Sequence, residues 1–368
     1  MPAESPPPGS AFKHWFDEGR YRRIADLLEG QSSKFDRRKF LALTLVGLEQ
    51  RTLMERLRQT ALAYEAALPG SFRDKLDVLR TIAPKVDHAF VAISIGDFVA
   101  REGLDDAKHS LDALREITRY GSSEFAVRPF LQRDLAGTLA VMEAWAHDGD
   151  EHVRRLSSEG SRPRLPWGLR LTELVRDPRP TAPILKALRR DPSLYVRKSV
   201  ANHLNDITKD HPRMVMDLVE GWDRSVSETA WIARHALRTL IKRGDRRALA
   251  LMGARAGADV KVERFSVKPR RVKLGDRIDL ETRIVSKSRR PQTLIVDYVV
   301  HYVKASGSAF PKVFKWKVVT LAPGESLALS KRQQIRDFST RRHHAGRHDV
   351  ELQINGIRPA RDHFQLVK

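Results

Sequence analysis

EHVRRLSSEGSRPRLPWGLRL, residues 151–171, and LYVRKSVANHLNDITKD, residues 194–210, contain the pattern around which the chain is organised. Both begin with apolar residues that recur every three to four positions, which predicts a helix. Each helix carries an acid on its basic, polar side, Glu159 in the first and Asp206 in the second. The turn between them is rich in Pro and Arg and carries Trp167, which has no apolar helix face to enter. The pattern predicts two helices whose acids face one groove.

The helical spacing extends from Phe12 to about Gly257, with Pro and Gly between the periodic segments. Three segments open alike, with a basic residue directly after Val153, Val196 or Ala233. These positions are about 40 residues apart, which is typical of helix-pair repeats. We therefore predict a mainly α protein whose residues 11–257 form a HEAT-like repeat array with a concave inner face.

Two helix starts are predicted from an acid next to a proline. The pairs are Asp191-Pro192 and, with His211 between them, Asp210 and Pro212. An acid at the N-cap accepts a backbone hydrogen bond, and proline is tolerated at the first helical position.

The pattern changes near Ala258. Seven short runs of alternating apolar residues follow, separated by Gly, Pro and basic turns, and predict strands: VKVERFSVKP, DRIDLETRIVS, TLIVDYVVHYV, VFKWKVVTL, LALSKRQQI, HDVELQING and DHFQLVK. Seven strands in about 110 residues fit an antiparallel sandwich of the immunoglobulin type. We expect this domain at residues 258–368 and a disordered leader at residues 1–10.

Charge is the strongest global feature of the sequence. The formal net charge is +21, and residues 259–368 alone hold 24 Lys and Arg against 11 Asp and Glu. Such a field attracts polyanions, of which nucleic acid is the commonest in a cytosol. Cysteine is absent, which excludes disulfides, a thiolate nucleophile and cysteine-bound zinc. No long apolar run or secretory signal occurs, so we expect a cytoplasmic protein that does not enter a membrane.

Several segments resemble bacterial DNA alkylation repair proteins of the AlkC type. They are FKHWFDEGRYRRIADLL at 12–28, RRLSSEGSRPRLPWGLRL at 154–171 and LRRDPSLYVRKSVANHLNDITKDHP at 188–212, followed by the sandwich. The resemblance implies a monofunctional DNA glycosylase on HEAT-like repeats, with an immunoglobulin-like domain that helps to grip DNA. The implied substrates are N3-methylated bases in duplex DNA, notably 3-methyladenine and 3-methylcytosine, and the product is an abasic site in base excision repair.

The resemblance also implies four site residues, Glu124, Glu159, Trp167 and Asp206. An N3-alkylated base is cationic and leaves without protonation, so the enzyme has to stabilise an oxocarbenium-like sugar and position a water. Carboxylates can do both, and an aromatic face adds cation–π stabilisation. This chemistry requires neither a metal nor a cofactor.

Each of these residues also has an ordinary structural interpretation. Glu124 follows a Gly-Ser-Ser turn and fits the first turn of a helix, where acids are favoured by the helix dipole. Glu159 fits an i, i+4 surface pair with Arg155. Asp206 lies late in its helix, where the dipole disfavours an anion, and this favours a functional role.

Basic residues on the two helices, in their turn and in the sandwich loops are expected to contact DNA phosphates, although any one of them is also consistent with an ordinary solvated cation. They are Arg155, Arg162, Arg164, Arg197, Lys198, Arg234, Arg238, Lys268, Arg270, Arg271, Arg289, Arg290, Arg341 and Arg342. His343 and His344 are adjacent and lack the spacing for joint metal coordination, so we expect no metal site.

The expected partner is double-stranded DNA that contains alkylated bases, bound by a monomer. A shallow groove offers no pocket for an extruded base, and the resemblance implies capture by bending the duplex, with the sandwich as a clamp. No lysine in the central stretch is placed to suggest lyase chemistry. Two alternatives remain, a non-catalytic HEAT-repeat protein that binds distorted or branched DNA, and a HEAT-type protein scaffold.

Overall fold

The computed structural model describes residues 10–338 and 342–367, which divide into two compact units. Unit 1 contains the residues up to His211 together with Trp222–Ala236, and unit 2 contains Pro212–Gly221 and the residues from Leu237 onward. Of the expected leader, residues 1–9 lie outside the described residues, and Ser10 begins the first helix. The predicted domain boundary at residues 257 and 258 falls between the last helix and the first strand.

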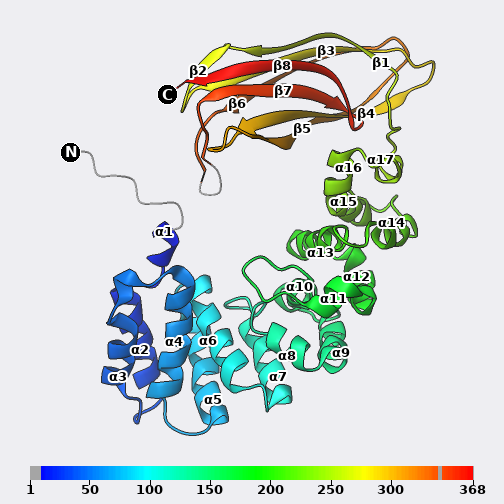
Figure 1. The fold of residues 1–368 in the computed structure, drawn as a ribbon. Coiled ribbons are helices and arrows are strands. Elements are labelled where there is room, and N and C mark those ends of the chain that lie inside the picture. Colours follow the sequence, from blue (N-terminus) through cyan, green and yellow to red (C-terminus); the bar gives the residue numbers. More distant parts are fainter. Residues whose placement is uncertain (1–9, 339–341, 368) are drawn as a thin grey trace. The chain divides into compact units, whose positions relative to one another are not determined.

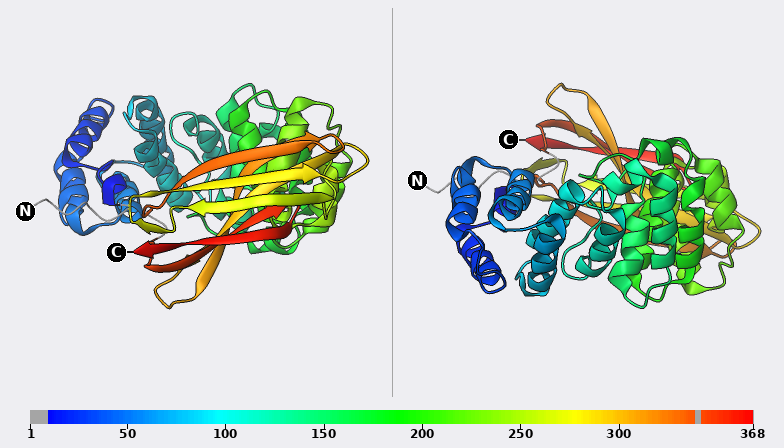
Figure 2. Two further views of the ribbon diagram at one scale, coloured as in Figure 1. Left: turned by 90° about the horizontal axis from the view of Figure 1, so that it is seen from above. Right: turned by 90° about the horizontal axis from the view of Figure 1, so that it is seen from below.

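Unit 1 is built from short helices that follow one another side by side in chain order, as Figures 1 and 2 show from three directions. Its helices are α1 (Ser10–Lys13), α2 (Glu18–Glu29), α3 (Arg37–Leu45), η1 (Leu48–Gln50), α4 (Leu53–Ala67), α5 (Phe72–Ile82), η2 (Ala83–Lys85), α6 (Ala89–Glu102), α7 (Ala107–Ile117), α8 (Arg128–Arg133), α9 (Leu135–Trp145), α10 (Glu151–Gly160), α11 (Thr172–Arg176), η3 (Arg179–Thr181), α12 (Ala182–Ala187), η4 (Leu188–Arg190), α13 (Leu194–Ile207) and α15 (Ser227–Ala236). Unit 2 contains α14 (Pro212–Glu220), α16 (Arg238–Arg243) and α17 (Arg246–Leu251).

The repeat predicted from sequence is visible in the packing of unit 1. Helix α10 packs on α13, and α13 packs on α15. The matching positions Val153, Val196 and Ala233 are all buried in these contacts. The prediction of a HEAT-like helical array is confirmed.

One predicted helix start is wrong. Helix α13 begins at Leu194, and its N-cap is Ser193, whose hydroxyl accepts from the Tyr195 backbone N–H at 3.2 Å. Asp191 is buried and pairs with Arg154, at 2.7 Å between Oδ2 and Nε. Its carboxylate is held by this ion pair on the preceding repeat and does not cap the helix. For the other predicted start, the position of Pro212 is confirmed, because α14 begins there, and the carboxylate of Asp210 pairs with Arg164.

The predicted immunoglobulin-like sandwich is also confirmed, with one strand more than expected. A three-stranded sheet has the order β1-β3-β6, and a five-stranded sheet has the order β2-β8-β7-β4-β5. The strands are β1 (Val260–Lys268), β2 (Arg271–Lys273), β3 (Arg277–Ser286), β4 (Gln292–Val303), β5 (Ala309–Leu321), β6 (Ser326–Gln334), β7 (Gly346–Ile354) and β8 (Ile357–Val367). The missed strand β2 has three residues and runs parallel to β8, whereas the other pairs are antiparallel.

Alternation along the strands produces the sandwich core. In β3 every second residue from Ile278 to Ser286 is buried, and the residues between them are exposed or half-buried. Ile278 and Leu280 meet Tyr298 and Val300 of β4 and Phe364 of β8 in one apolar cluster between the two sheets. Because cysteine is absent, this apolar packing holds the sheets together without a disulfide.

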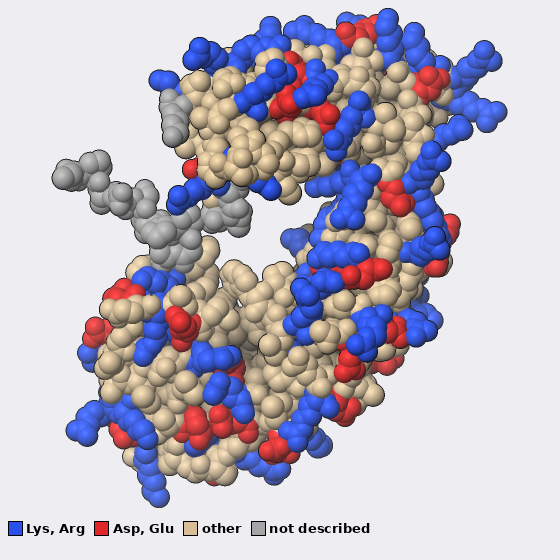
Figure 3. Space-filling view, viewed as in Figure 1, with Lys and Arg blue, Asp and Glu red and all other residues tan. Residues whose placement is uncertain are grey.

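On the face shown in Figure 3, Lys and Arg side chains are spread over both units, with Asp and Glu among them. Within the described ranges, no helix combines the length and the apolar character needed to cross a bilayer.

Candidate active site

The turn of residues 161–171 follows α10 and is held by one buried arginine from an earlier helix. Arg128, at the start of α8, donates from Nη1 to the Gly160 carbonyl oxygen at 2.7 Å and from Nε to the Leu169 carbonyl oxygen at 2.6 Å. Gly168 permits this approach, since a Cβ there would lie 3.3 Å from the Arg128 side chain. Arg128 therefore fixes both ends of the turn.

Burial lowers the pKa of Arg128 to about 10, and repulsion from the nearby Arg162 acts in the same direction. Its Nη2 atom is buried and has no hydrogen-bond partner among the described residues. Burying a charged group costs folding free energy, because the group loses its hydration. The hydrogen bonds of Arg128 to the two carbonyl oxygens offset that cost, and whatever they do not offset lowers the stability of the folded chain. Sequence reasoning missed Arg128, because the chain shows only an arginine before Pro129 and no sign of its distant carbonyl partners.

Two of the predicted site acids are joined through one guanidinium group. Arg162 lies 2.5 Å from Glu159, between Nη1 and Oε1, and 2.8 Å from Asp206, between Nη2 and Oδ2. All three side chains are buried, with 7%, 6% and 4% of Arg162, Glu159 and Asp206 exposed. Burial alone would lower the pKa of Arg162, but the two carboxylates outweigh it and raise this pKa.

The third acid joins the same network through a second arginine. Arg155 pairs with Glu124 and lies 3.6 Å from Glu159. Its Nη1 also donates to the Ser122 hydroxyl at 2.7 Å, and that hydroxyl donates to Glu124 at 2.8 Å. Glu124 lies in a turn before α8, and not in the first turn of a helix as expected, so Arg155 and Ser122 hold it in place of a helix dipole.

A lysine lies beside Asp206 at the other end of this network. Lys209 Nζ donates to Asp206 Oδ1 at 3.0 Å. The set Glu124, Arg155, Glu159, Arg162, Asp206 and Lys209 is therefore one continuous chain of alternating charges, which we call the carboxylate network. Among the described residues, no group of His, Asp and Glu is arranged to hold a metal ion.

A neutral histidine links the two helices that carry the network. His203 of α13 is fully buried, and its Nδ1 lies 3.0 Å from the Ser158 carbonyl oxygen of α10. Burial lowers the pKa of His203 to about 3, and the charge of Arg162 contributes. This ring therefore adds no positive charge to the network at neutral pH.

Trp167 is exposed, as predicted, with 70% of its surface accessible. Its φ angle of 65° lies in the left-handed region, which residues with large side chains rarely adopt. Such backbone strain persists only where the surrounding structure enforces it and is concentrated at functional sites. The ring of Phe90 meets it edge to face at 6.5 Å, and Trp167 is presented to solvent from the same turn that carries Arg162 of the carboxylate network.

The predicted basic residues fall into different environments. Arg155 and Arg162 pair inside the carboxylate network, Arg164 pairs with Asp210, Arg197 donates to the carbonyl oxygens of Asp191 and Pro192, and Arg270 pairs with Asp362. Seven others are exposed: Lys198, Arg234, Lys268, Arg271, Arg289, Arg290 and Arg342. Arg238 is half-buried in α16, and Arg341 lies outside the described residues.

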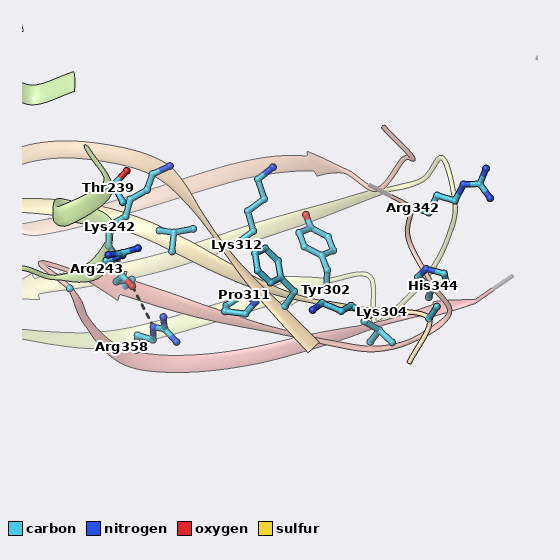
Figure 4. Close-up of a pocket in the computed structure, with 16 residues that line it drawn as sticks. Thr239, Lys242, Arg243, Tyr302, Lys304, Pro311, Lys312, Arg342, His344 and Arg358 are labelled. Atoms are coloured by element: carbon cyan, nitrogen blue, oxygen red, sulfur yellow. Dashed lines mark hydrogen bonds between the residues drawn. The ribbon is translucent and has the colours of Figure 1, made fainter. Parts of the chain in front are cut away.

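Unit 2 contains a cationic pocket of about 860 Å³ that sequence reasoning largely missed (Figure 4). Its lining has six cations and no described acid: Lys242, Arg243, Lys304, Lys312, Arg342 and Arg358. Tyr302 and Phe310 add aromatic surface. Of the cations, only Arg342 was expected from sequence. The others come from separate parts of the chain, with Lys242 and Arg243 adjacent on α16, Lys304 just after β4, Lys312 on β5 and Arg358 on β8.

Comparison with known proteins defines the class of this molecule, a helical-repeat array with a C-terminal immunoglobulin-like domain. Residues 261–368 match the family model described as the C-terminal Ig-like domain of the uncharacterised protein YhaZ. The chain is 39% identical to the uncharacterized protein YhaZ of Bacillus subtilis over 345 residues, which cover 94% of this chain and 96% of that protein.

The solved structure of the Pseudomonas fluorescens alkylpurine DNA glycosylase AlkC, bound to DNA that contains an abasic site analog, is similar over the whole chain. It is 46% identical and has a TM-score of 0.94, with 97% of this chain and 99% of that chain covered. The chain therefore belongs to the AlkC family, and the resemblance seen in the sequence is confirmed.

Proposed function

We propose that this chain is a monofunctional DNA glycosylase that hydrolyses the N-glycosidic bond of N3-alkylated bases in duplex DNA and leaves an abasic site. The proposed substrates are 3-methyladenine and 3-methylcytosine, and the proposed setting is a cytoplasmic monomer in base excision repair. The observation that carries the proposal is the buried carboxylate network, with the exposed Trp167 in the turn that carries its Arg162, in a chain 46% identical to an alkylpurine DNA glycosylase.

The chemistry of the network supports this activity. N3 alkylation gives the base a positive charge, so it departs without an acid, and the developing positive charge moves to the sugar. Glu159 and Asp206 supply fixed negative charge against that sugar and can accept a proton from the attacking water. Because Arg162 joins the two carboxylates, we assign it a positioning role in place of the phosphate contact expected from sequence.

Trp167 supports recognition of a cationic lesion. An aromatic face attracts a cation within about 6 Å by about 0.5–2 kcal/mol, depending on how far the site is desolvated. Its strained backbone holds the ring at the protein surface, and the exposed ring can meet DNA there. We assign Arg155 with Glu124 to the same site, as the pair that extends the network of ion pairs toward the turn before α8.

DNA contacts are proposed for the exposed cations of both units. In unit 2 the cationic pocket gathers more positive charge than any predicted loop, so we add its residues to the expected phosphate contacts. Cations that neutralise phosphates give an affinity that falls steeply with salt. Arg164, Arg197, Arg270 and the pocket residue Arg358 are bound to acids or carbonyl oxygens of the chain itself, and we rank them below the other cations.

The test is release of free base from methylated duplex DNA under single-turnover conditions, with 3-methyladenine and 3-methylcytosine measured separately. We expect release by the native chain, and a strong loss in Glu159→Gln and in Asp206→Asn with DNA affinity retained. Glu151→Gln is the matched control, since Glu151 begins the same helix, is exposed and lies outside the network. Full rates in both amide variants would exclude the assigned roles.

The same assay separates the alternative functions. A non-catalytic protein that binds distorted or branched DNA would bind the duplex in a salt-dependent way but release no base. A protein scaffold would do neither. Strand cleavage at the abasic product would contradict the monofunctional assignment and direct attention to Lys209 beside Asp206.

A further inference from the structure

A row of aromatic side chains in unit 1 extends from Trp167 to the first helix. The ring centroids of Trp167 and Phe90 are 6.5 Å apart, those of Phe90 and Trp15 are 5.2 Å apart, and those of Trp15 and Phe12 are 4.8 Å apart. Both ends are open to solvent, with 46% of Phe12 exposed, and the two central rings are half-buried. We call these four residues the aromatic strip.

The backbone beneath the strip is fixed by arginine side chains. Arg56 is buried and donates from Nη1 to the carbonyl oxygens of Lys13 at 3.1 Å and Phe16 at 2.7 Å, and Arg20 donates to the carbonyl oxygen of Trp15. His88, which caps α6, packs its ring 4.7 Å from Trp15. These contacts hold large apolar rings at the surface, where a contiguous exposed patch usually marks a binding site.

The charges around the strip indicate what kind of ligand fits it. Lys13 pairs with Glu49, and Arg20 and Arg23 both pair with Asp87. Acids of the chain itself engage these cations, so the strip offers mainly ring faces to a ligand. Nucleobases fit such a surface, because every base has a π-face that stacks on an aromatic ring whatever its sequence.

We propose that the aromatic strip stacks unpaired bases of a single DNA strand that leads away from the candidate active site. The inference rests on the proposed function, because Trp167 belongs to both the strip and that site. Stacked bases are about 3.4 Å apart along a strand. The centroids of neighbouring rings in the strip are further apart than this, so successive rings can meet different bases. A strand bent or opened at a lesion would supply such bases.

The test uses the full chain, two probes and two variants of the exposed Phe12. The first probe is a single-stranded oligothymidylate, and the second is an oligomer of equal length with abasic sites in place of all bases. Phe12→Leu keeps an apolar side chain but removes the ring, and Phe12→Trp keeps a ring. We expect Phe12→Leu to weaken oligothymidylate binding by about 5-fold or more in fluorescence anisotropy, while Phe12→Trp retains it. Neither variant should change binding of the base-free oligomer.

Three results would overturn the inference. An equal loss for both probes would mean that the strip contacts the sugar-phosphate backbone. Unchanged binding in a folded Phe12→Leu variant would mean that the ring takes no part. Loss of self-association in sedimentation of the same variant would mean that a second copy covers the strip.

The probes carry no lesion, so their binding does not depend on excision. If the chain binds oligothymidylate through Phe12 but releases no methylated base, the result supports this inference and contradicts the proposed function. If the chain excises methylated bases but Phe12→Leu does not change oligothymidylate binding, the result contradicts this inference and leaves the proposed function standing.

Discussion

Replacing Arg162 by methionine tests whether the carboxylate network is held together by one guanidinium group. The change leaves Glu159 and Asp206 buried without their shared partner, and removal of one member of a buried ion pair costs about 3–5 kcal/mol. Arg155 at 3.6 Å from Glu159 and Lys209 at 3.0 Å from Asp206 remain as weaker partners. We therefore expect the lower end of the range, about 3 kcal/mol.

The assay is thermal unfolding followed by circular dichroism at 222 nm, where the helices dominate the signal. For a unit of this size, about 3 kcal/mol corresponds to a fall in Tm of roughly 6–12 °C. Arg164→Met is the matched control, because Arg164 lies in the same turn and pairs with Asp210 at the surface, where a pair contributes at most about 1 kcal/mol. A Tm shift for Arg162→Met no larger than that of Arg164→Met would refute the reasoning.

Three further predictions concern other parts of the chain. Burial raises the pKa of Asp297 to about 6, so the folded state binds more protons than the unfolded chain, and stability falls as the pH rises from about 4 to 6. Asp297→Asn should therefore gain about 3 kcal/mol in urea unfolding at pH 7.5 and nothing near pH 3.5, and equal gains at both pH values would contradict this. Arg128→Lys should slow single-turnover excision by about 10²-fold through misplacement of the turn, with DNA affinity, measured in parallel, unchanged. Lys242→Gln and Lys304→Gln should each reduce the salt slope of DNA binding by about 1, whereas the exposed Lys331→Gln outside the pocket should not.

Much of the fold follows from local periodicity, which a single sequence displays. Alternation in β3 from Ile278 to Ser286 predicted a strand with one buried face, and the structure has that pattern. Strand β2 has only three residues, with Val272 as the one buried position, so it shows no alternation to detect. Its pairing with β8 depends on a partner about ninety residues away.

The candidate site was predictable only in part. Trp167 could be expected at the surface, because its Pro- and Arg-rich turn has no apolar spacing. Arg162 could be linked by spacing to Glu159 three residues earlier, but its bond to Asp206 spans 44 residues. The sequence likewise does not indicate that Asp191 pairs with Arg154 and leaves the N-cap of α13 to another residue. Long-range ion pairs of this kind depend on how repeats pack, which the order of residues does not reveal.

The buried Arg128 has a consequence for the order in which the molecule assembles. Its two carbonyl partners lie 32 and 41 residues further along the chain, a separation similar to that between helices of successive repeats. Contacts between distant residues require loop closure and form more slowly than local ones. The turn that presents Trp167 therefore takes its final shape only after α8 and α10 have docked, so we expect catalytic competence to appear later in refolding than helicity.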